Sequence, residues 1–238
     1  MQSLRVDLHS HSTYSDGYNT PLQMWERARD IGFTHYALTD HNTVDGAIEL
    51  AEIVRDTSGP ELISGVELSF LQAHFLLLGV PLPRLKRQLE KWQIPPATSA
   101  FIANTSFVLD CLKWTKDQGG VVVAAHPGLL FHAFSLSLEE VYKHYSDGLI
   151  DGAERANGQL EHYLPTLLYS YWQKGLETFL TEQSIPGYAF SDAHWAHDPS
   201  LTTGDLGTPY SLVEIPDGLS LTDALLAKQV EVTRQRVR

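Results

Sequence analysis

The sequence predicts an α/β protein in which parallel strands alternate with helices. Short apolar runs, of the length of buried strands, alternate with segments that show helical periodicity and capping residues. The chain has 238 residues, 43% of them apolar and 19% charged, and barrels of alternating strands and helices commonly fill this length as one unit. Histidines and acids follow several apolar runs, at the strand ends where such folds gather functional groups. We therefore expect a single domain over residues 1–238.

The N-terminal half contains the first strands and helices of this pattern. Thr20 and Pro21 supply an N-cap and a first helical residue for a helix that stops at Gly32. Further helices are expected over residues 44–55 and 81–93, the second with a basic, solvent-facing side. The strands expected in this half cover residues 4–8, 36–39, 61–67 and 72–80.

The C-terminal half continues the alternation without a linker or a repeat. Its clearest buried strand is the Val-Val-Val-Ala-Ala run at residues 121–125. Expected strands cover residues 121–125, 149–153, 186–190 and 211–215, and expected helices cover residues 105–118, 138–145, 162–182 and 220–229.

The segment from Asp7 to Gly17 contains the first candidate site. On extended backbone, His9 and His11 point to the same side, because side chains alternate along a strand. Asp16 adds a carboxylate from a polar turn, and a mixed nitrogen and oxygen set suits Zn, Mn or Fe. Because a His-x-His pair also occurs by chance, this motif alone leaves both a metal site and an ordinary strand end open.

Residues of the same kinds follow later strands. Glu67 lies among apolar neighbours, where a buried carboxylate is costly without a partner. Chance would scatter such residues over both strand ends and the helices, so their placement indicates a metal site. The residues are His41, Glu67, His126, Asp192 and His194, together with His74 at the start of a further apolar run.

Composition excludes several classes of function. The formal charge of −12, from 29 acids and 17 bases, argues against binding of a long nucleic acid, which relies on Lys and Arg, but not against a small phosphorylated substrate. Cys111 is the single cysteine, so metal ligands must be His, Asp or Glu. Neither a signal peptide nor a membrane span is apparent, so we expect a cytoplasmic protein without a membrane partner. The sequence predicts no particular oligomeric state.

Together the motifs resemble those of the polymerase and histidinol phosphatase (PHP) family, over essentially the whole chain. The resemblance implies a distorted, TIM-like (β/α)7 barrel with two or three divalent metal ions, Zn, Mn, Fe or Mg, in its mouth. The motifs are the opening segment, Thr39-Asp40-His41, Gly65-Val66-Glu67, His74, Ala125-His126-Pro127-Gly128 and Ser191-Asp192-Ala193-His194.

The resemblance also implies roles for these residues. Glu67 would bridge two metals, and Glu67, Asp192 and His194 would be catalytic. The metals would lower the pKa of a shared water from about 15.7 toward neutrality and so supply a bridging hydroxide that attacks a phosphate ester. Carried over by position, the ligands would be His9, His11, Glu67 and Asp192 for one metal, Asp16, His41 and His194 for a second, and Glu67, His74 and His126 for a third.

The resemblance implies a class of substrate. The spacing from Glu67 to His74 and the Ala-His-Pro-Gly motif are similar to those of small members that remove phosphate from nucleotides, including 3′,5′-bisphosphates. This implies a metal-dependent phosphoric monoester hydrolase with a small nucleotide substrate. Some members place an arginine soon after His-Pro-Gly, and we expect Arg155 and His197 as substitute phosphate contacts. Trp195 is expected to pack at the barrel rim rather than to stack on a substrate ring.

Three alternatives stay open. They are a 5′–3′ exonuclease on short oligonucleotides, a histidinol phosphatase, and a non-catalytic metal-binding accessory or regulatory module of the kind fused to polymerases. The complete set of candidate ligands counts against the last. A barrel whose histidines only satisfy core hydrogen bonds would not explain why they gather at strand ends.

Overall fold

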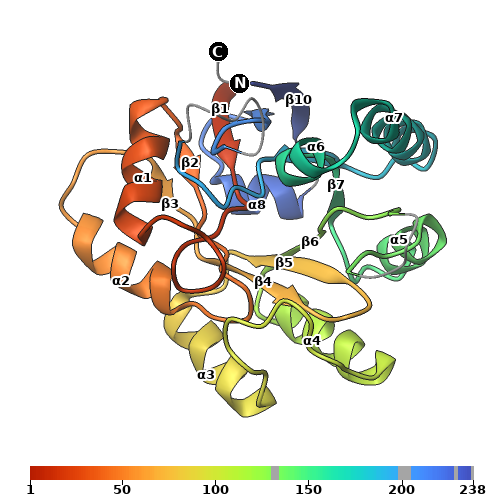
Figure 1. Cartoon of the computed structure of the whole chain (residues 1–238), viewed down its shortest axis with the longest axis horizontal. Helices are drawn as coiled ribbons and strands as arrows, with labels where there is room; N and C mark the ends of the chain where they lie inside the picture. The colour runs from red at the N-terminus through yellow and green to blue at the C-terminus, as the bar shows by residue number, and fades with distance from the viewer. Residues whose placement is uncertain (130–133, 198–204, 228–229, 237–238) are drawn as a thin grey trace.

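Strands occupy the centre of the molecule and helices surround them (Figure 1). The computed structural model describes residues 1–129, 134–197, 205–227 and 230–236. The strands are β1 (Gln2–Asp7), β2 (His35–Tyr36), β3 (Glu61–Leu62), β4 (Gly65–Ser69), β5 (His74–Leu78), β6 (Val121–Ala124), β7 (Gly152–Asn157), β8 (Gly187–Phe190), β9 (Tyr210–Ile215) and β10 (Glu231–Gln235). They form two five-stranded sheets, in the orders β10-β9-β1-β2-β3 and β4-β5-β6-β7-β8.

Single bridges join the two sheets. Ser10 pairs with Ala193, just beyond the ends of β1 and β8, and His41 pairs with Glu67 of β4. The strands β1, β2, β4, β5, β6, β7 and β8 therefore follow one another in a ring, which is the distorted α/β barrel that the sequence predicts. Both bridges lie next to candidate ligands, so closure of the ring brings the ligand-bearing segments together.

The sheets differ from the expected parallel arrangement, because β5, β9 and β10 run antiparallel to their neighbours, and one expected strand is divided in two. β5 is antiparallel to both β4 and β6, because only residues 70–73 connect β4 to β5 and so short a connection joins antiparallel strands. His74 therefore reaches the same end of the ring from the start of its strand. The single strand expected over residues 61–67 is two strands, β3 and β4, which belong to different sheets. Glu67 consequently lies within β4, where the sequence placed it at a strand end.

The helices are α1 (Pro21–Asp30), α2 (Asp45–Val54), α3 (Leu82–Trp92), α4 (Thr105–Asp117), α5 (Leu138–Ser146), α6 (Gly158–Tyr163), α7 (Thr166–Glu182) and α8 (Leu221–Leu226). Thr20 caps α1 as expected, and Gln23 completes a capping box. The helix expected over residues 162–182 is broken into α6 and α7, because Pro165 holds Leu164 in an extended conformation. The helix expected over residues 220–229 ends at Leu226, and residues 228 and 229 lie outside the described part of the chain.

β7 also begins later than the sequence predicts and continues through the polar residues Glu154 and Asn157. Both of these side chains are fully buried although they are polar. A prediction based on runs of apolar residues therefore misses this part of the strand. β10 was not predicted at all. Among the described residues, no helix is both long and apolar enough to cross a membrane.

Candidate metal centre

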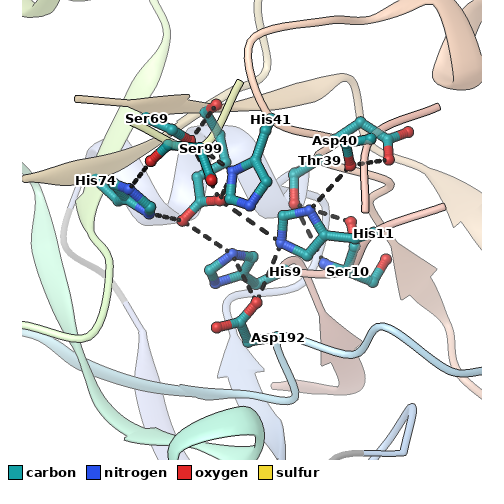
Figure 2. A network of polar contacts seen from close by, with 12 residues as sticks. His9, Ser10, His11, Thr39, Asp40, His41, Ser69, His74, Ser99 and Asp192 are labelled. Carbon is teal, nitrogen blue, oxygen red and sulfur yellow. Dashed lines mark hydrogen bonds and ion pairs between the residues drawn. The ribbon is translucent and has the colours of Figure 1, made fainter. Parts of the chain in front are cut away.

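The side chains that the sequence predicts as metal ligands converge at the end of the ring where the sheets are bridged. Figure 2 shows His9, His11, His41, His74 and Asp192 pointing toward one another. All nine predicted residues except Asp16, whose side chain is 48% exposed, are buried. Ligand atoms within 4.8 Å of one another come from three groups: His11, Asp16, His41 and His194; His9, His11 and Glu67; and His41, Glu67 and His74.

The carboxylate of Glu67 lies at the centre of the cluster and is 1% exposed. Burial raises the pKa of this carboxyl, but the neighbouring histidines, His74 foremost, outweigh burial and hold the pKa well below its usual range. Glu67 is therefore an anion surrounded by imidazoles. Its oxygens lie 3.2, 3.6, 2.7, 3.0 and 3.4 Å from ring nitrogens of His9, His11, His41, His74 and His126, respectively.

A second carboxylate, Asp16, lies against the outer side of the cluster. Its oxygens are 3.3 Å from Nε2 of His41 and 3.2 Å from Nε2 of His194. Burial lowers the pKa of His41, but Glu67 and Asp16 raise it to about 10. For His11, burial and the adjacent His41 and His194 lower the pKa to about 4. The carboxylates and the neighbouring imidazoles thus shift the pKa values of His41 and His11 in opposite directions.

The turn that carries Asp16 is held by Asp40. One oxygen of Asp40 accepts hydrogen bonds from the Ser12 backbone N–H and the Ser15 hydroxyl, both at 2.7 Å, and the other accepts from the Ser12 hydroxyl at 2.8 Å. Gly17 closes this turn, because a Cβ there would lie 2.5 Å from the carbonyl oxygen of His11. The local sequence therefore fixes the distance between the His-x-His pair and Asp16.

Glu154 and Asn157 of β7 belong to the site, although the sequence did not identify them. Glu154 accepts a hydrogen bond from Nδ1 of His9 at 2.7 Å, from the His126 backbone N–H at 2.8 Å and from Nδ2 of Asn157 at 2.9 Å. The same Asn157 nitrogen lies 3.0 Å from Asp192. Glu154 thus orients a predicted ligand rather than joining the cluster itself. The spacing of Glu154 and Asn157 after an apolar run was the available signal, but it resembles an ordinary strand end.

Backbone conformation also serves the site. His126 and Asp192 have positive φ angles of 31° and 51°, which L-residues rarely adopt. The bond from the His126 N–H to Glu154 helps to hold the first of these. Non-glycine residues in this region tend to occur where function requires them.

The hydrogen-bonding state of the imidazoles shows that the cluster fits a cation. Nε2 of His74 donates to the Ser99 carbonyl at 2.9 Å, and Nδ1 of His194 donates to the Asp192 carbonyl at 2.9 Å. In a neutral ring the other nitrogen carries a lone pair, and in His74 this nitrogen faces Glu67. Nε2 of His9 is buried without a hydrogen-bond partner, between Glu67 and Asp192. Lone pairs that face carboxylates need a proton or a metal ion between them, and this mixed donor set suits divalent ions.

A cavity of about 250 Å³ adjoins the cluster. Its lining combines predicted ligands with apolar side chains and two other polar residues. No Lys or Arg lines it among the described residues, so the protein supplies no fixed positive charge there except protonated histidine. The cavity is lined by His41, Glu67, His74, Ser99, His126, Leu129, Phe134, Gln159, Leu160, Asp192 and His194.

The two predicted phosphate contacts lie elsewhere. Arg155 alternates with the inward-facing Glu154 along β7, so its guanidinium points away, donating to the Val232 carbonyl at 3.0 Å and lying 3.7 Å from Glu177. His197 pairs with Asp205 at 2.9 Å. Neither residue is among those that line the cavity, and a phosphate contact from either stays a prediction.

The fold and the cluster together define the class of the protein: an α/β barrel that binds divalent metal in its mouth. The family model of the PHP domain matches residues 7–184, and the chain belongs to the PHP domain family.

Similar proteins agree with this membership. A segment of 65 residues is 48% identical to the 5′-3′ exoribonuclease of Haemophilus influenzae, covering 27% of this chain and 23% of that protein, so the chain matches less than a quarter of that relative's length. Among solved structures, a two-domain protein of Bacteroides vulgatus containing a predicted PHP-like metal-dependent phosphoesterase superposes with a TM-score of 0.67 at 17% identity, over 98% of this chain and 65% of that one. The lesion-specific endonuclease EndoQ of Pyrococcus furiosus superposes with a TM-score of 0.61 at 18% identity, over 99% and 58%. These likenesses establish the shared fold, and family membership supports hydrolase activity.

Proposed function

We propose that this protein is a metal-dependent phosphoesterase that hydrolyses a small phosphate monoester, namely a nucleotide or a nucleoside 3′,5′-bisphosphate. The observation that carries the proposal is the position of Glu67, a fully buried carboxylate with ring nitrogens of five histidines 2.7 to 3.6 Å from its oxygens. A buried anion in such surroundings is suited to bridge metal ions. Membership in the PHP domain family supports the same chemistry.

Two or three divalent ions would be held by the nine residues of the cluster. His9, His11, Glu67 and Asp192 form one proposed set, Asp16, His41 and His194 a second, and Glu67, His74 and His126 a third. When bound, such ions activate water as a nucleophile and neutralise charge on the phosphate. Zn, Mn, Fe and Mg are all candidates for this mixed donor set.

The chain's own residues orient the site. Glu154 keeps Nδ1 of His9 protonated, so Nε2 faces Glu67 and Asp192. The Asp192 carbonyl does the same for His194, whose Nε2 faces Asp16. Glu67, Asp192 and His194 all line the cavity, which places these three proposed catalytic residues next to an ester bound there.

The apolar part of the cavity lining would contact the leaving group of the ester. Leu129, Phe134 and Leu160 are apolar, and Phe134 approaches the ring of His74 to 5.4 Å between centroids. These side chains exclude water from one side of the ester. The absence of Lys and Arg from the described lining, together with the charge of −12, favours a small substrate over a long polyanion.

A second candidate is 5′–3′ exonuclease activity on short oligonucleotides. The 48% identity to part of an exoribonuclease favours it. A short strand held at one end needs few basic residues, so the acidic charge is compatible with this activity.

The experiment is a phosphate-release and product assay of the metal-loaded protein on adenosine 3′,5′-bisphosphate, AMP, a 5′-phosphorylated dinucleotide, histidinol phosphate and an aryl phosphate. We expect hydrolysis with a strong preference for one nucleotide, and loss of turnover in Glu67→Gln. His35→Gln is the matched control, because His35 lies at the other end of its segment from His41 and contacts Glu61 at 3.4 Å. No hydrolysis of any ester, with bound metal verified by elemental analysis, would favour the accessory-module alternative. Full activity in Glu67→Gln would contradict the proposed site.

A further inference from the structure

Three aromatic side chains lie together beside the metal centre, and we call Tyr18, Trp195 and His162 the aromatic shelf. The rings of Tyr18 and Trp195 are stacked, with centroids 4.9 Å apart and an interplanar angle of 7°. The ring of His162 meets Trp195 edge-on at 6.0 Å. Tyr18 is 69% exposed, whereas Trp195 and His162 are partly buried. A large aromatic surface therefore faces solvent in a fixed orientation.

The shelf is attached to the segments that carry predicted ligands. Tyr18 follows Asp16 by two residues, and Trp195 directly follows His194, whose ring centroid is 6.2 Å from that of Trp195. The Tyr18 backbone N–H donates to the His194 carbonyl at 2.8 Å, and the Ala196 N–H donates to the Asn19 side chain at 2.8 Å. These bonds lock the two segments together, so the stack keeps its position relative to the cluster.

The shelf also shares its walls with the cavity. α6 contributes Gln159 and Leu160 to the cavity lining and His162 to the shelf. His194 lines the cavity while its neighbour Trp195 forms the shelf. Residues of α6 and of the His194 segment therefore take part in both the cavity and the shelf, which places the rings beside the cavity.

We propose that the aromatic shelf binds the nucleobase of the substrate by stacking. This inference rests on the proposed phosphoesterase function and identifies what the enzyme recognises beyond the phosphate. The base belongs either to the nucleotide whose phosphate lies in the cavity or to the next nucleotide of a short strand.

Two physical arguments support a base over other groups. The described lining of the cavity offers no Lys or Arg to hold the phosphate, so contacts with the rest of the substrate would have to add to its binding. Stacking on aromatic side chains is tolerant of base identity and does not require positive charge, which suits a protein with a net charge of −12. The sequence favoured packing of Trp195 at the barrel rim, and Trp195 does pack against Tyr18, but the Tyr18 side chain stays 69% exposed and so remains available to a ligand.

The test compares one pair of substrates that differ by a base and a second pair that differ by one nucleotide. The kcat/KM for AMP is divided by that for ribose 5-phosphate, and the kcat/KM for 5′-phosphorylated diadenylate is divided by that for AMP. Tyr18→Ala should lower one of these ratios at least about fivefold, mainly through KM, whereas Tyr18→Phe should restore it. A fall in the first ratio assigns the shelf to the hydrolysed nucleotide, and a fall in the second alone assigns it to the next one. Tyr171→Ala is the matched control, since Tyr171 is an equally exposed tyrosine on α7 at 77%.

A second measurement does not depend on turnover. AMP is titrated into chelator-treated protein while tryptophan fluorescence is recorded, and stacking should quench the emission in the wild type but not in Trp195→Phe. Unchanged substrate ratios in Tyr18→Ala, together with the same quenching in Trp195→Phe as in the wild type, would overturn the shelf while leaving the phosphoesterase proposal intact. Failure to hydrolyse any ester, with Trp195-dependent quenching retained, would instead overturn the proposed function and keep the shelf as a base-binding site.

Discussion

Glu154→Gln tests the orientation of the metal centre with a change of one atom. Glu154 is fully buried, and its three hydrogen-bond contacts are all donors: Nδ1 of His9, the His126 N–H and Nδ2 of Asn157. A glutamine at position 154 has one oxygen and one NH₂ group, so the NH₂ must replace one of the two carboxylate oxygens that accept these hydrogen bonds. If the NH₂ faces His9, the imidazole must present a lone pair at Nδ1 and a proton at Nε2, where the metal would bind. If the NH₂ replaces the other oxygen, it faces the His126 N–H and Nδ2 of Asn157, which are donors themselves and lose their acceptor.

Either orientation therefore costs metal affinity. Loss of a partner that orients a ligand histidine weakens metal binding by about 10- to 100-fold, equivalent to about 1 to 3 kcal/mol. The assay is competition for Zn²⁺ or Mn²⁺ against a chromogenic chelator of known affinity, with circular dichroism to verify that the variant is folded.

The matched control is Glu177→Gln, the same substitution at a half-exposed side chain that lies 3.7 Å from Arg155 on the outer side of the barrel. It should keep wild-type affinity. A folded Glu154→Gln protein that binds all of its metal with unchanged affinity would refute the argument that Glu154 sets the His9 tautomer.

Other perturbations address the turn, the protonation state and the support of Asp16. Gly17→Ala should lower the free energy of unfolding by about 1 to 3 kcal/mol, because its Cβ would lie 2.5 Å from a backbone oxygen. The control is Gly175→Ala, which has open space around it within α7 and should be neutral or stabilising in the same thermal melts. Metal binding should release protons near neutral pH and strengthen as pH rises toward 10, because His41, with its pKa raised to about 10, must lose a proton to become a ligand; a pH-independent affinity in calorimetry would contradict this. Asp40→Ala removes the acceptor of the Ser15 hydroxyl and of the Ser12 backbone N–H, so it should reduce the number of bound ions measured by elemental analysis more than it lowers the melting temperature.

The parts of this protein that the sequence could predict depend on local signals. The cap at Thr20 and the buried run of β6 are short-range patterns that fold as expected. The nine candidate ligands lie close together, as the resemblance to the PHP family implied from short motifs, although Glu67 lies within β4 and Asp16 in a polar turn. These residues could therefore be identified from the sequence without knowing which residues they contact in the fold.

The rest depended on contacts between distant segments. Glu154 is recognisable as a site residue only when β7 lies beside β1, because its partner His9 is 145 residues away. The outward direction of Arg155 follows from the same strand, whose buried polar residues look like a loop in sequence. The reversal of β5 and the change of sheet between β3 and β4 are set by pairing, which hydrophobic periodicity alone does not specify.

The bridged seam between the two sheets has a consequence for the mechanics of the whole molecule. His9, His11, Asp16 and His41 follow strands of one sheet, whereas Glu67, His74, His126, Asp192 and His194 belong to or follow strands of the other. Ions held by these residues would add further cross-links between two sheets that already share the bridges at Ser10 and His41, other hydrogen bonds and an apolar cluster. The supply of metal would then govern how long the protein survives proteases as well as whether it turns over substrate, since any ligand that binds only the folded state shifts the unfolding equilibrium by mass action.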